Sequence, residues 1–403
     1  MNDLEKLIQE LCPQGVSYVE IGTSVNYEQP TKYIVNSTKY DDTYKTPVLT
    51  AGQTFVLGYT DETQGIYPAS KENPVIIFDD FTGAFKWVDF PFKVKSSAMK
   101  ILTANEEKAM LRYVYHFMGA LNFTSDEHKR LWIATYSKFK MPLPPLPVQR
   151  EIVRILDNFT ELTAELTAEL TARKKQYEYY RDELLKSKVD IPMMKLKDIA
   201  TEMYRGSGIK RDEVTAEGIP CVRYGEIYTT YNTWFDTCVS HTKLENVQSP
   251  KYFENGDILF AITGESVEDI AKSVAYVGHE KCLAGGDIVV MKHNQNPRYL
   301  AHALATRAAR EQKSKGKVKS KVVHASVPSI EQIEIPVPPL DVQKRYADVL
   351  DNFEEICNNL NIGLPAEIEA RKKQYEYYRD MLLTFAAADD IILTDRQTDR
   401  QTD

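Results

Sequence analysis

The chain has 403 residues, of which 43% are hydrophobic and 27% are charged, and its formal net charge at pH 7 is −8. This length predicts two or three domains, and the composition excludes a disordered protein. The acidic balance excludes nucleic-acid binding through overall charge, so DNA binding would need local basic patches or help from a partner. No apolar run approaches the roughly 18 residues that cross a bilayer, and the acidic start MNDLEKLIQEL is unlike a signal peptide. We therefore expect a cytoplasmic protein without a membrane segment.

The five cysteines are scattered along the chain and contain no C-x-x-C pair. No histidine pair at zinc spacing lies near them, so the sequence predicts reduced, structural thiols and no metal site. The cysteines are Cys12, Cys221, Cys238, Cys282 and Cys357.

Residues 1–145 have the pattern of a mixed α/β domain. The runs TPVLTAG, NPVIIFDDF and SSAMKILTA are rich in β-branched and aliphatic residues and predict strands. The run LRYVYHFMGAL follows them and has the period of a helix.

A long helix is predicted over residues 146–186. The proline cluster MPLPPLP before it favours extended chain, and apolar residues then step by four and three, as in a coiled coil. TAEL occurs at Thr163–Leu166 and again at Thr167–Leu170, which makes a stutter that unwinds a supercoil without ending the helix. From Val148 to Leu185 the helix would run about 57 Å. It ends in the eleven-mer ARKKQYEYYRD.

The second half of the chain repeats this layout. In residues 187–338 the runs IPCVRYGEIYTTY, DILFAITG and GGDIVVMKH predict strands, and RYLAHALATRAAREQ predicts helix. In residues 339–385, IPVPPLDVQKRYADVLDNF matches MPLPPLPVQREIVRILDNF, and ARKKQYEYYRD returns. Gly363-Leu364-Pro365 predicts that this second helix stops, restarts and bends. The repetitive polar tail TDRQTDRQTD, in residues 386–403, predicts disorder.

Together the halves predict an α+β fold: two mixed α/β domains separated by two long antiparallel coiled-coil helices, with a pseudo-two-fold internal repeat. We expect both apolar seams to be buried between the helices. The seam residues are Val148, Ile152, Ile155, Phe159, Leu162, Leu166, Leu170, Tyr177 and Leu184, and in the second helix Val342, Tyr346, Val349, Phe353, Ile356, Leu360, Ile368, Tyr375, Tyr378 and Leu382.

Three features, PLPPLPVQREIVRILDNF, the TAEL array and the duplicated eleven-mer, resemble the specificity subunit of type I restriction-modification systems over almost the whole chain. The resemblance implies two target-recognition domains (1–145 and 187–338) on two spacers (146–186 and 339–385). It also implies a bipartite, asymmetric double-stranded DNA target with a fixed gap. Its expected partners are two methyltransferase subunits, which carry S-adenosylmethionine, and restriction subunits, which use ATP and Mg.

The resemblance further implies that this chain itself catalyses nothing and holds no cofactor. The residues independently favour the same interpretation. The sequence contains no G-x-x-x-x-G-K-[ST] phosphate loop and no strand-linked G-x-G-x-x-G, and Gly206-Ser207-Gly208 is too short a match to count.

The eleven-mer places tyrosines, an arginine and a leucine on one helix face, and these residue types are favoured at protein interfaces. One interpretation is that they only pack the two helices against each other. The identity of both copies, down to their charged surface residues, favours two equivalent partner sites, which the resemblance assigns to the methyltransferase subunits. The predicted partner-binding residues are Tyr177, Tyr180, Arg181 and Leu184, and Tyr375, Tyr378, Arg379 and Leu382.

Basic residues interleaved with aromatic ones mark the candidate DNA contacts, because phosphates attract lysine and arginine and base edges suit arginine and glutamine. The strongest basic cluster, ATRAAREQKSKGKVKSKVVH, suits a phosphate clamp, although a solvated loop is the alternative. The candidates are Gln29, Lys32, Gln53, Lys86, Trp87, Lys95, Lys129 and Arg130 in the first domain, and Arg205, Lys210, Arg211, Arg223, Tyr224, Lys313, Lys315, Lys317 and Lys319 in the second.

Two other classes of function stay open at this point. A non-DNA scaffold with two ligand- or protein-binding domains on a coiled-coil strut would suit the acidic balance, and it would never retard DNA in a sequence-dependent way. A single-chain nuclease or methylase is disfavoured by the missing cofactor motifs, and would have to methylate DNA with added S-adenosylmethionine.

Overall fold

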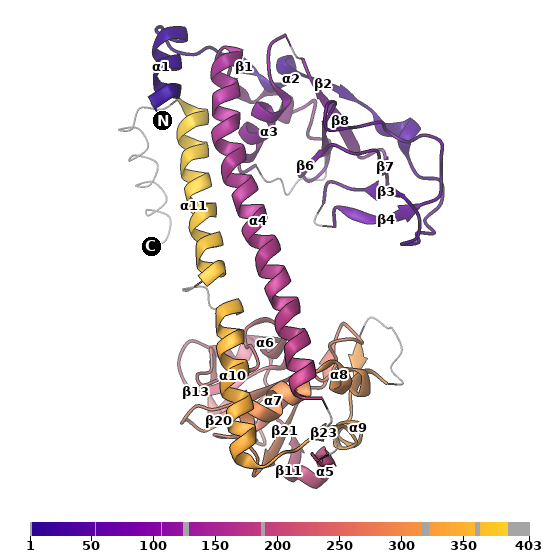
Figure 1. The fold of residues 1–403 in the computed structure, drawn as a ribbon, viewed down its shortest axis with the longest axis vertical. Helices are drawn as coiled ribbons and strands as arrows, with labels where there is room; N and C mark the ends of the chain where they lie inside the picture. Colours follow the sequence, from indigo (N-terminus) through magenta and orange to yellow (C-terminus); the bar gives the residue numbers. More distant parts are fainter. Residues whose placement is uncertain are drawn as a thin grey trace. The chain divides into compact units, whose positions relative to one another are not determined.

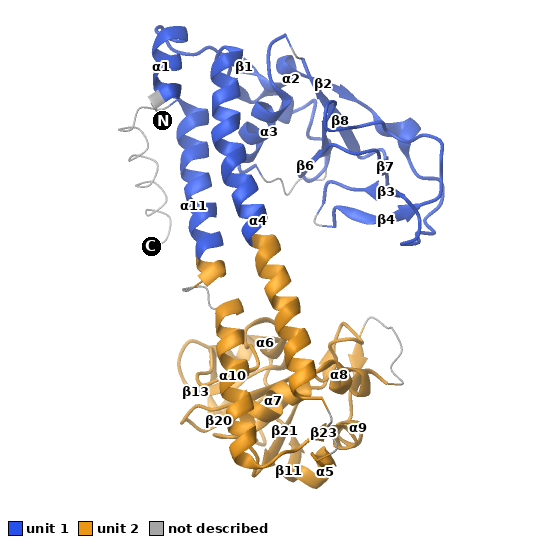
Figure 2. Cartoon of the chain, in the orientation of Figure 1, with its two compact units in different colours: residues 1–166, 367–403 blue, residues 167–366 orange. Residues whose placement is uncertain are grey.

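A computed structural model of the chain describes residues 2–52, 54–105, 107–123, 129–186, 190–315, 322–358 and 363–385. Its contacts divide the chain into two compact units: unit 1 combines residues 1–166 with 367–403, and unit 2 is residues 167–366 (Figure 2). Each unit therefore contains one predicted domain, the first part of the spacer that follows it and the last part of the other spacer. The predicted tail lies outside the described residues.

Unit 1 contains a four-stranded antiparallel sheet in the order β2-β8-β5-β6 and a three-stranded sheet in the order β4-β3-β7 (Figure 1). The three predicted strand runs form β3, β5 and β8. Alternate residues of β5 enter different cores, since Ile76 faces one apolar cluster and Ile77 the other. The strands are β1 (Tyr18–Glu20), β2 (Val25–Glu28), β3 (Thr46–Leu49), β4 (Val56–Thr60), β5 (Val75–Asp79), β6 (Phe85–Val88), β7 (Lys93–Val94), β8 (Met99–Ala104) and β9 (Lys140–Pro142).

The core of unit 1 joins this sheet to the spacers through helix α3. Tyr113 and Phe117 of α3 belong to the same buried cluster as Ile152 of the first spacer and Leu383 of the second. The helices are α1 (Asn2–Leu11), α2 (Ile21–Ser24) and α3 (Leu111–Ala120), with short 3-10 turns η1 (Pro30–Tyr33) and η2 (Tyr136–Lys138).

Unit 2 repeats the plan with a five-stranded sheet in the order β11-β21-β17-β19-β14 and a second one in the order β12-β15-β13-β20-β16. The predicted runs DILFAITG and GGDIVVMKH contain β17 and β21. The strands are β10 (Met193–Lys195), β11 (Ala200–Arg205), β12 (Val214–Thr215), β13 (Ile219–Val222), β14 (Trp234–Phe235), β15 (Ser240–Thr242), β16 (Tyr252–Phe253), β17 (Ile258–Ala261), β18 (Thr263–Gly264), β19 (Ser273–Tyr276), β20 (Cys282–Ala284), β21 (Ile288–His293), β22 (Val323–His324) and β23 (Glu334–Pro336).

Helix α7 has in unit 2 the place that α3 has in unit 1. Its Tyr299 and Leu300 share a buried cluster with Ala347 of the second spacer and Tyr177 of the first. One strand prediction is wrong in part: IPCVRYGEIYTTY forms β13 and then helix α6, where the Glu226 side chain accepts from the Arg223 amide and starts the turn. The helices are α5 (Leu196–Ile199), α6 (Tyr224–Thr229), α7 (Pro297–Ala305), α8 (Arg307–Ser314) and α9 (Val327–Glu331), with turns η3 (Arg211–Glu213) and η4 (Leu244–Asn246).

The spacers are helical where the sequence predicts. Helix α4 (Leu146–Leu184) is continuous through both TAEL units, as expected for a stutter. The second spacer is described as two helices, α10 (Leu340–Asn358) and α11 (Gly363–Thr384), and the residues between them lie outside the described part of the chain. Gly363, the first residue of α11, has a φ of 64°, a left-handed conformation that a regular helix does not contain. In unit 1, α11 lies beside α4 and runs in the opposite direction, and in unit 2, α10 does the same (Figure 1). None of the helices described is long and apolar enough to cross a membrane.

The predicted seam of the second spacer is wrong in its register over α10, whereas Ile368 and Leu382 of α11 are buried as predicted and Leu360 lies outside the described residues. Val349, Phe353 and Ile356 remain 47%, 46% and 49% exposed. The buried residues of α10 are one position further along, at Gln343, Ala347, Leu350 and Cys357. The reason is that α10 packs against helix α7 of its own domain, so its buried face serves that contact.

Gly206 provides a test of the close packing in unit 2. A Cβ at Gly206 would come within 2.5 Å of the carbonyl oxygen of Ala284, whereas a Cβ at Gly208 would meet no heavy atom within 4 Å. We predict that Gly206→Ala lowers the free energy of unfolding by about 1–3 kcal/mol. Gly208→Ala should change it by less than about 0.5 kcal/mol. Urea unfolding of the intact chain measures both, and equal effects of the two substitutions would contradict this packing.

Candidate functional site

A basic pocket of about 820 Å³ opens in unit 2, and we call it the arginine pocket. Arg205 reaches it from the end of β11, and Arg211 from the start of η3. Arg223 and Tyr224 come from the junction between β13 and α6. The remaining lining includes the glycines Gly208, Gly225, Gly285 and Gly286. Four of the nine predicted DNA-contacting residues of this domain therefore meet around one opening.

The charges of the arginine pocket are only partly compensated. Arg205 pairs with Asp287 at 2.5 Å, and Arg223 lies 3.3 Å from a carboxylate oxygen of Glu226. Arg211 is exposed and has no ion pair within the described part of the chain. The pocket is therefore positively charged locally, although the whole chain is acidic.

The remaining candidates of this domain lie apart from one another. Lys210 is exposed beside the pocket and pairs with Glu213 at 3.3 Å, and Lys315 is exposed just after α8. Lys313 is a correction: it is 7% exposed, and its Nζ donates to the carbonyl oxygen of Leu304 at 2.9 Å. A side chain held in this way cannot reach a phosphate, so it leaves the candidate set. Lys317 and Lys319 lie outside the described residues.

In unit 1 the candidates lie on several elements. Gln29 and Lys32 are exposed around η1, and Lys32 pairs with Glu28 at 2.8 Å. Lys86 and Trp87 are half-buried on β6, and Gln53 lies outside the described residues. The other three, Lys95, Lys129 and Arg130, are exposed.

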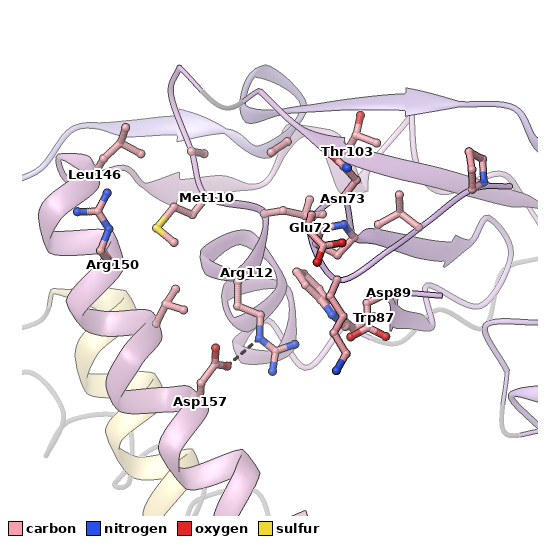
Figure 3. Close-up of a pocket in the computed structure, with 18 of the residues that line it drawn as sticks. Glu72, Asn73, Trp87, Asp89, Thr103, Met110, Arg112, Leu146, Arg150 and Asp157 are labelled. Atoms are coloured by element: carbon pink, nitrogen blue, oxygen red, sulfur yellow. Dashed lines mark hydrogen bonds and ion pairs between the residues drawn. The ribbon is translucent and has the colours of Figure 1, made fainter. Parts of the chain in front are cut away.

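A pocket of about 1180 Å³ lies between the strands of unit 1 and the start of α4 (Figure 3). Trp87 is the described DNA candidate that lines it. The guanidinium of Arg112 is 4.7 Å from the Trp87 ring centroid, and its Nε donates to Asp157 at 2.7 Å. Figure 3 shows this arginine between the spacer and the tryptophan. Trp87 is thus tied to the spacer by a cation–π contact and an ion pair.

Beside this pocket, three chain segments meet at a buried histidine. His116 of α3 has both ring nitrogens engaged: Nε2 is 2.8 Å from Asp157 of α4, and Nδ1 is 3.0 Å from the Tyr375 hydroxyl of α11. A carboxylate can only accept, so Nε2 carries the proton, and in a neutral ring Nδ1 accepts from the tyrosine. We call Tyr375, His116, Asp157 and Arg112 the unit 1 junction.

Unit 2 contains the same arrangement, built from the other copies of these segments. His302 of α7 lies 2.8 Å from Asp351 of α10 through Nε2 and 3.1 Å from the Tyr177 hydroxyl of α4 through Nδ1. Arg298 pairs with Asp351 and, at 2.8 Å, with Asp348. We call Tyr177, His302, Asp351 and Arg298 the unit 2 junction.

Burial and hydrogen bonding set the charge states in the unit 1 junction. Burial lowers the pKa of His116 and outweighs the opposing effect of the hydrogen bond that Nε2 donates to Asp157. For Asp157, burial opposes ionisation, but the hydrogen bonds from His116 and Arg112 outweigh it and lower the pKa. The favoured state is therefore a neutral histidine beside an ionised aspartate.

The structure corrects the role predicted for half of the eleven-mer face. Tyr177, Arg181 and Arg379 are buried within their own units, and the guanidiniums of Arg181 and Arg379 lie 5.6 and 5.7 Å from the rings of Tyr177 and Tyr375. Leu382 is buried, while Leu184 and Tyr375 are half-buried. The four buried side chains, Tyr177, Arg181, Arg379 and Leu382, pack within the chain's own units, so they are not free for another protein. The packing alternative also needs correction, because the contacts are with domain helices as well as with the other spacer.

Other residues of the eleven-mer do face solvent. Tyr180 is 51% exposed, whereas its counterpart Tyr378 is half-buried and stacks on Phe159 with ring centroids 5.3 Å apart. Six residues of the eleven-mer are exposed in both copies: Ala172, Lys174, Lys175, Gln176, Glu178 and Tyr179 in the first, and Ala370, Lys372, Lys373, Gln374, Glu376 and Tyr377 in the second.

One group of side chains has the composition of a metal site. Ligand atoms of His302, Asp351 and Glu354 lie within 4.8 Å of one another. However, Asp351 already accepts from Trp234 at 2.9 Å and pairs with Arg298, and Glu354 accepts from the Thr233 hydroxyl at 2.6 Å. An arginine in contact with the carboxylate disfavours a cation, so this group fits an internal junction better than a metal centre. All five cysteines are buried and free.

His116 and His302 were not among the residues predicted from the sequence, although their sequence context contains a signal. Arg112-Tyr113-Val114-Tyr115-His116 and Arg298-Tyr299-Leu300-Ala301-His302 share the pattern R-Y-x-x-H. The tyrosine of each pattern donates to a proline carbonyl, Pro142 or Pro336, at 2.8 Å. Aligning the two domain helices, rather than the spacers alone, would have revealed it.

Comparison with known proteins adds a family match over both halves. The family model described as "Type I restriction modification DNA specificity domain" matches residues 13–173 and 188–370. The chain is 39% identical to the Escherichia coli type I restriction enzyme EcoR124I/EcoR124II specificity subunit, over 96% of this chain and 97% of that one. A solved chain described under "complex assembly and conformational transition of the type I R-M system" shares its fold, with a TM-score of 0.55, 15% identity and coverage of 92% of this chain and 98% of that one.

The lowered pKa of His116 predicts a pH dependence of stability. Between the lowered pKa and the ordinary value near 6.5, the unfolded chain binds a proton that the folded chain does not, so stability falls as the pH drops through about 6.5. We expect His116→Gln to reduce this dependence between pH 7 and pH 5 by up to about 1.4 kcal/mol per pH unit. Urea unfolding at a series of pH values measures the slope, and an unchanged slope would refute the assignment.

Proposed function

The chain belongs to the family of type I restriction-modification specificity subunits, and we propose that its two domains bind the two halves of a bipartite, asymmetric DNA target. It is a non-catalytic subunit. The observation that carries the DNA-binding proposal is the arginine pocket, where Arg205, Arg211 and Arg223 meet Tyr224 around an opening of about 820 Å³. The guanidinium fork suits both phosphate oxygens and the O6 and N7 acceptors of guanine.

The net charge of −8 shapes how this binding would work. Sequence-independent affinity comes mainly from neutralised phosphates, and the overall charge opposes it. A local cluster of arginines can select bases, while partner subunits supply further phosphate contacts. The chain would therefore read DNA best as part of a larger complex.

The partners in this proposal are two methyltransferase subunits, which bring S-adenosylmethionine, and restriction subunits, which use ATP and Mg. The eleven-mer residues exposed in both copies, with Tyr179 and Tyr377 among them, support two equivalent partner sites. An exposed tyrosine flanked by charged residues is typical of a protein interface. The buried Tyr177 and the half-buried Tyr375 are left out of this surface.

Arg211 gives the sharpest test of the DNA-binding proposal. Methylation-site sequencing of cells with and without the gene defines the target, and binding to that duplex is then measured with the chain and its methyltransferase subunits. We expect Arg211→Ala to weaken binding by about 1–3 kcal/mol and to relax one half-site. Lys140→Ala is the matched control. It also removes one exposed positive charge, but Lys140 lies in the first domain, away from the arginine pocket, and pairs there with Glu20. A complex that never retards DNA in a sequence-dependent way would favour the scaffold alternative.

The TAEL array gives a second test. Because α4 is continuous from Leu146 to Leu184, removing Thr163–Leu166 shortens one helix by about 6 Å, or at most about two base pairs of duplex. We expect the deletion to change the gap between the half-sites and to leave both half-site sequences intact. Methylation-site sequencing reads out both features. An unchanged gap with altered half-sites would contradict the idea that the spacer measures distance.

A further inference from the structure

The two junctions are crossed with respect to the sequence repeat. In each junction the arginine and histidine come from a domain helix, and the aspartate comes from the spacer that follows that domain. The tyrosine comes from the far end of the other spacer: Tyr375 serves the first domain, and Tyr177 serves the second. Each domain is thus held by the start of one spacer and the end of the other.

We infer that Tyr375 and Tyr177 are positioning residues for the domains that lie outside their own repeats, and that each junction secures the selectivity of one half-site. This inference rests on the proposed DNA-binding function. In this inference Tyr375, a residue of the second repeat, affects DNA recognition by residues 1–145. Tyr177, a residue of the first repeat, affects DNA recognition by residues 187–338.

The hydrogen bonds of each junction fix the end of the spacer at one position against the domain helix. His116 and His302 are almost completely buried, and a buried ring nitrogen without a partner costs free energy. Each imidazole therefore needs its carboxylate on one side and its hydroxyl on the other. Apolar side chains alone tolerate sliding of one helix along another, whereas this arrangement is satisfied at one position of the spacer end.

A second contact fixes the start of each spacer in the same two units. Oε1 of Gln149 accepts from the Met110 amide before α3, and Oε1 of Gln343 accepts from the Asn296 amide before α7, both at 2.9 Å. Both glutamines are fully buried. The glutamine holds the start of one spacer and the tyrosine holds the end of the other, so the domain helix lies between two polar attachments.

The crossed assignment also accounts for part of the identity between the two eleven-mers. Tyr177 and Tyr375 meet the same R-Y-x-x-H pattern on each domain, and Arg181 and Arg379 pair with the next residues, Asp182 and Asp380. Two copies that must satisfy identical buried partners have identical requirements. The exposed residues of the eleven-mer are left for the proposed partner subunits.

Two hydroxyl deletions, Tyr375→Phe and Tyr177→Phe, test the inference and serve as controls for each other. Hydrogen exchange on the full chain comes first. We expect Tyr375→Phe to speed exchange of α3 amides about two- to tenfold, the loss of roughly one hydrogen bond, and to leave α7 unchanged. Tyr177→Phe should do the reverse. Equal changes in both helices, or none in either, would overturn the crossed docking.

Methylation-site sequencing with the chain and its methyltransferase subunits comes second. Each variant should relax a different half-site, and the double variant should relax both. The role of the two tyrosines in selectivity would be overturned if each variant speeds hydrogen exchange in only one domain helix and methylation still discriminates fully at both half-sites. If the unsubstituted chain directs no sequence-specific methylation, the proposed function fails, and the exchange measurement still decides the crossed docking.

Discussion

The need to satisfy both nitrogens of a buried imidazole governs how each unit is assembled. Burial removes water as a partner, so His116 must find its hydrogen bonds within the protein. It finds them on Asp157 and Tyr375, which lie on different spacers. The domain helix, the start of one spacer and the end of the other therefore have to meet, and residues of the sheet belong to the same buried cluster. His302 imposes the same requirement on unit 2.

Around these shared junctions the two domains differ in what they present to the outside. Four strands follow the same order in both sheets: the first of the four in the chain lies beside the last, and the second and third come next. These strands are β2-β8-β5-β6 in one sheet and β11-β21-β17-β19 in the other. The arginine pocket of unit 2 is formed by turns next to the sheet, whereas unit 1 has its larger pocket beside Trp87 and the spacer. A common interior with unlike surfaces is what a protein needs to read two unrelated half-sites. In the proposed function, the shared interior fixes the position of each domain, and the loops decide which bases are accepted.

Long periodic or duplicated segments were predictable from the sequence, because their patterns are local. The spacers, strands β5 and β21, and the left-handed backbone at Gly363 follow from apolar period, β-branched residues and glycine–proline chemistry. The register of α10 was not predictable, since exposed Phe353 and buried Ala347 are assigned by a domain helix distant in sequence. The prediction that Lys313 contacts DNA failed for the same reason. Its basic neighbours suggest an exposed side chain, but in the folded protein its Nζ donates to the Leu304 carbonyl. The gathering of Arg205, Arg211 and Arg223 likewise depends on three turns that only the tertiary structure brings together.

The two units place different demands on a chain that emerges from the ribosome. Unit 2 is one continuous stretch, and its junction joins Tyr177 to His302 across 125 residues. Unit 1 closes across 259 residues, from His116 to Tyr375, and Tyr375 is translated only after all of unit 2. Doubling the loop adds only about 0.6 kcal/mol of closure entropy, so the difference lies mainly in timing. The histidine of the amino-terminal domain therefore lacks its tyrosine partner until α11 has been made, whereas His302 is translated after Tyr177 and meets a hydroxyl that is already present.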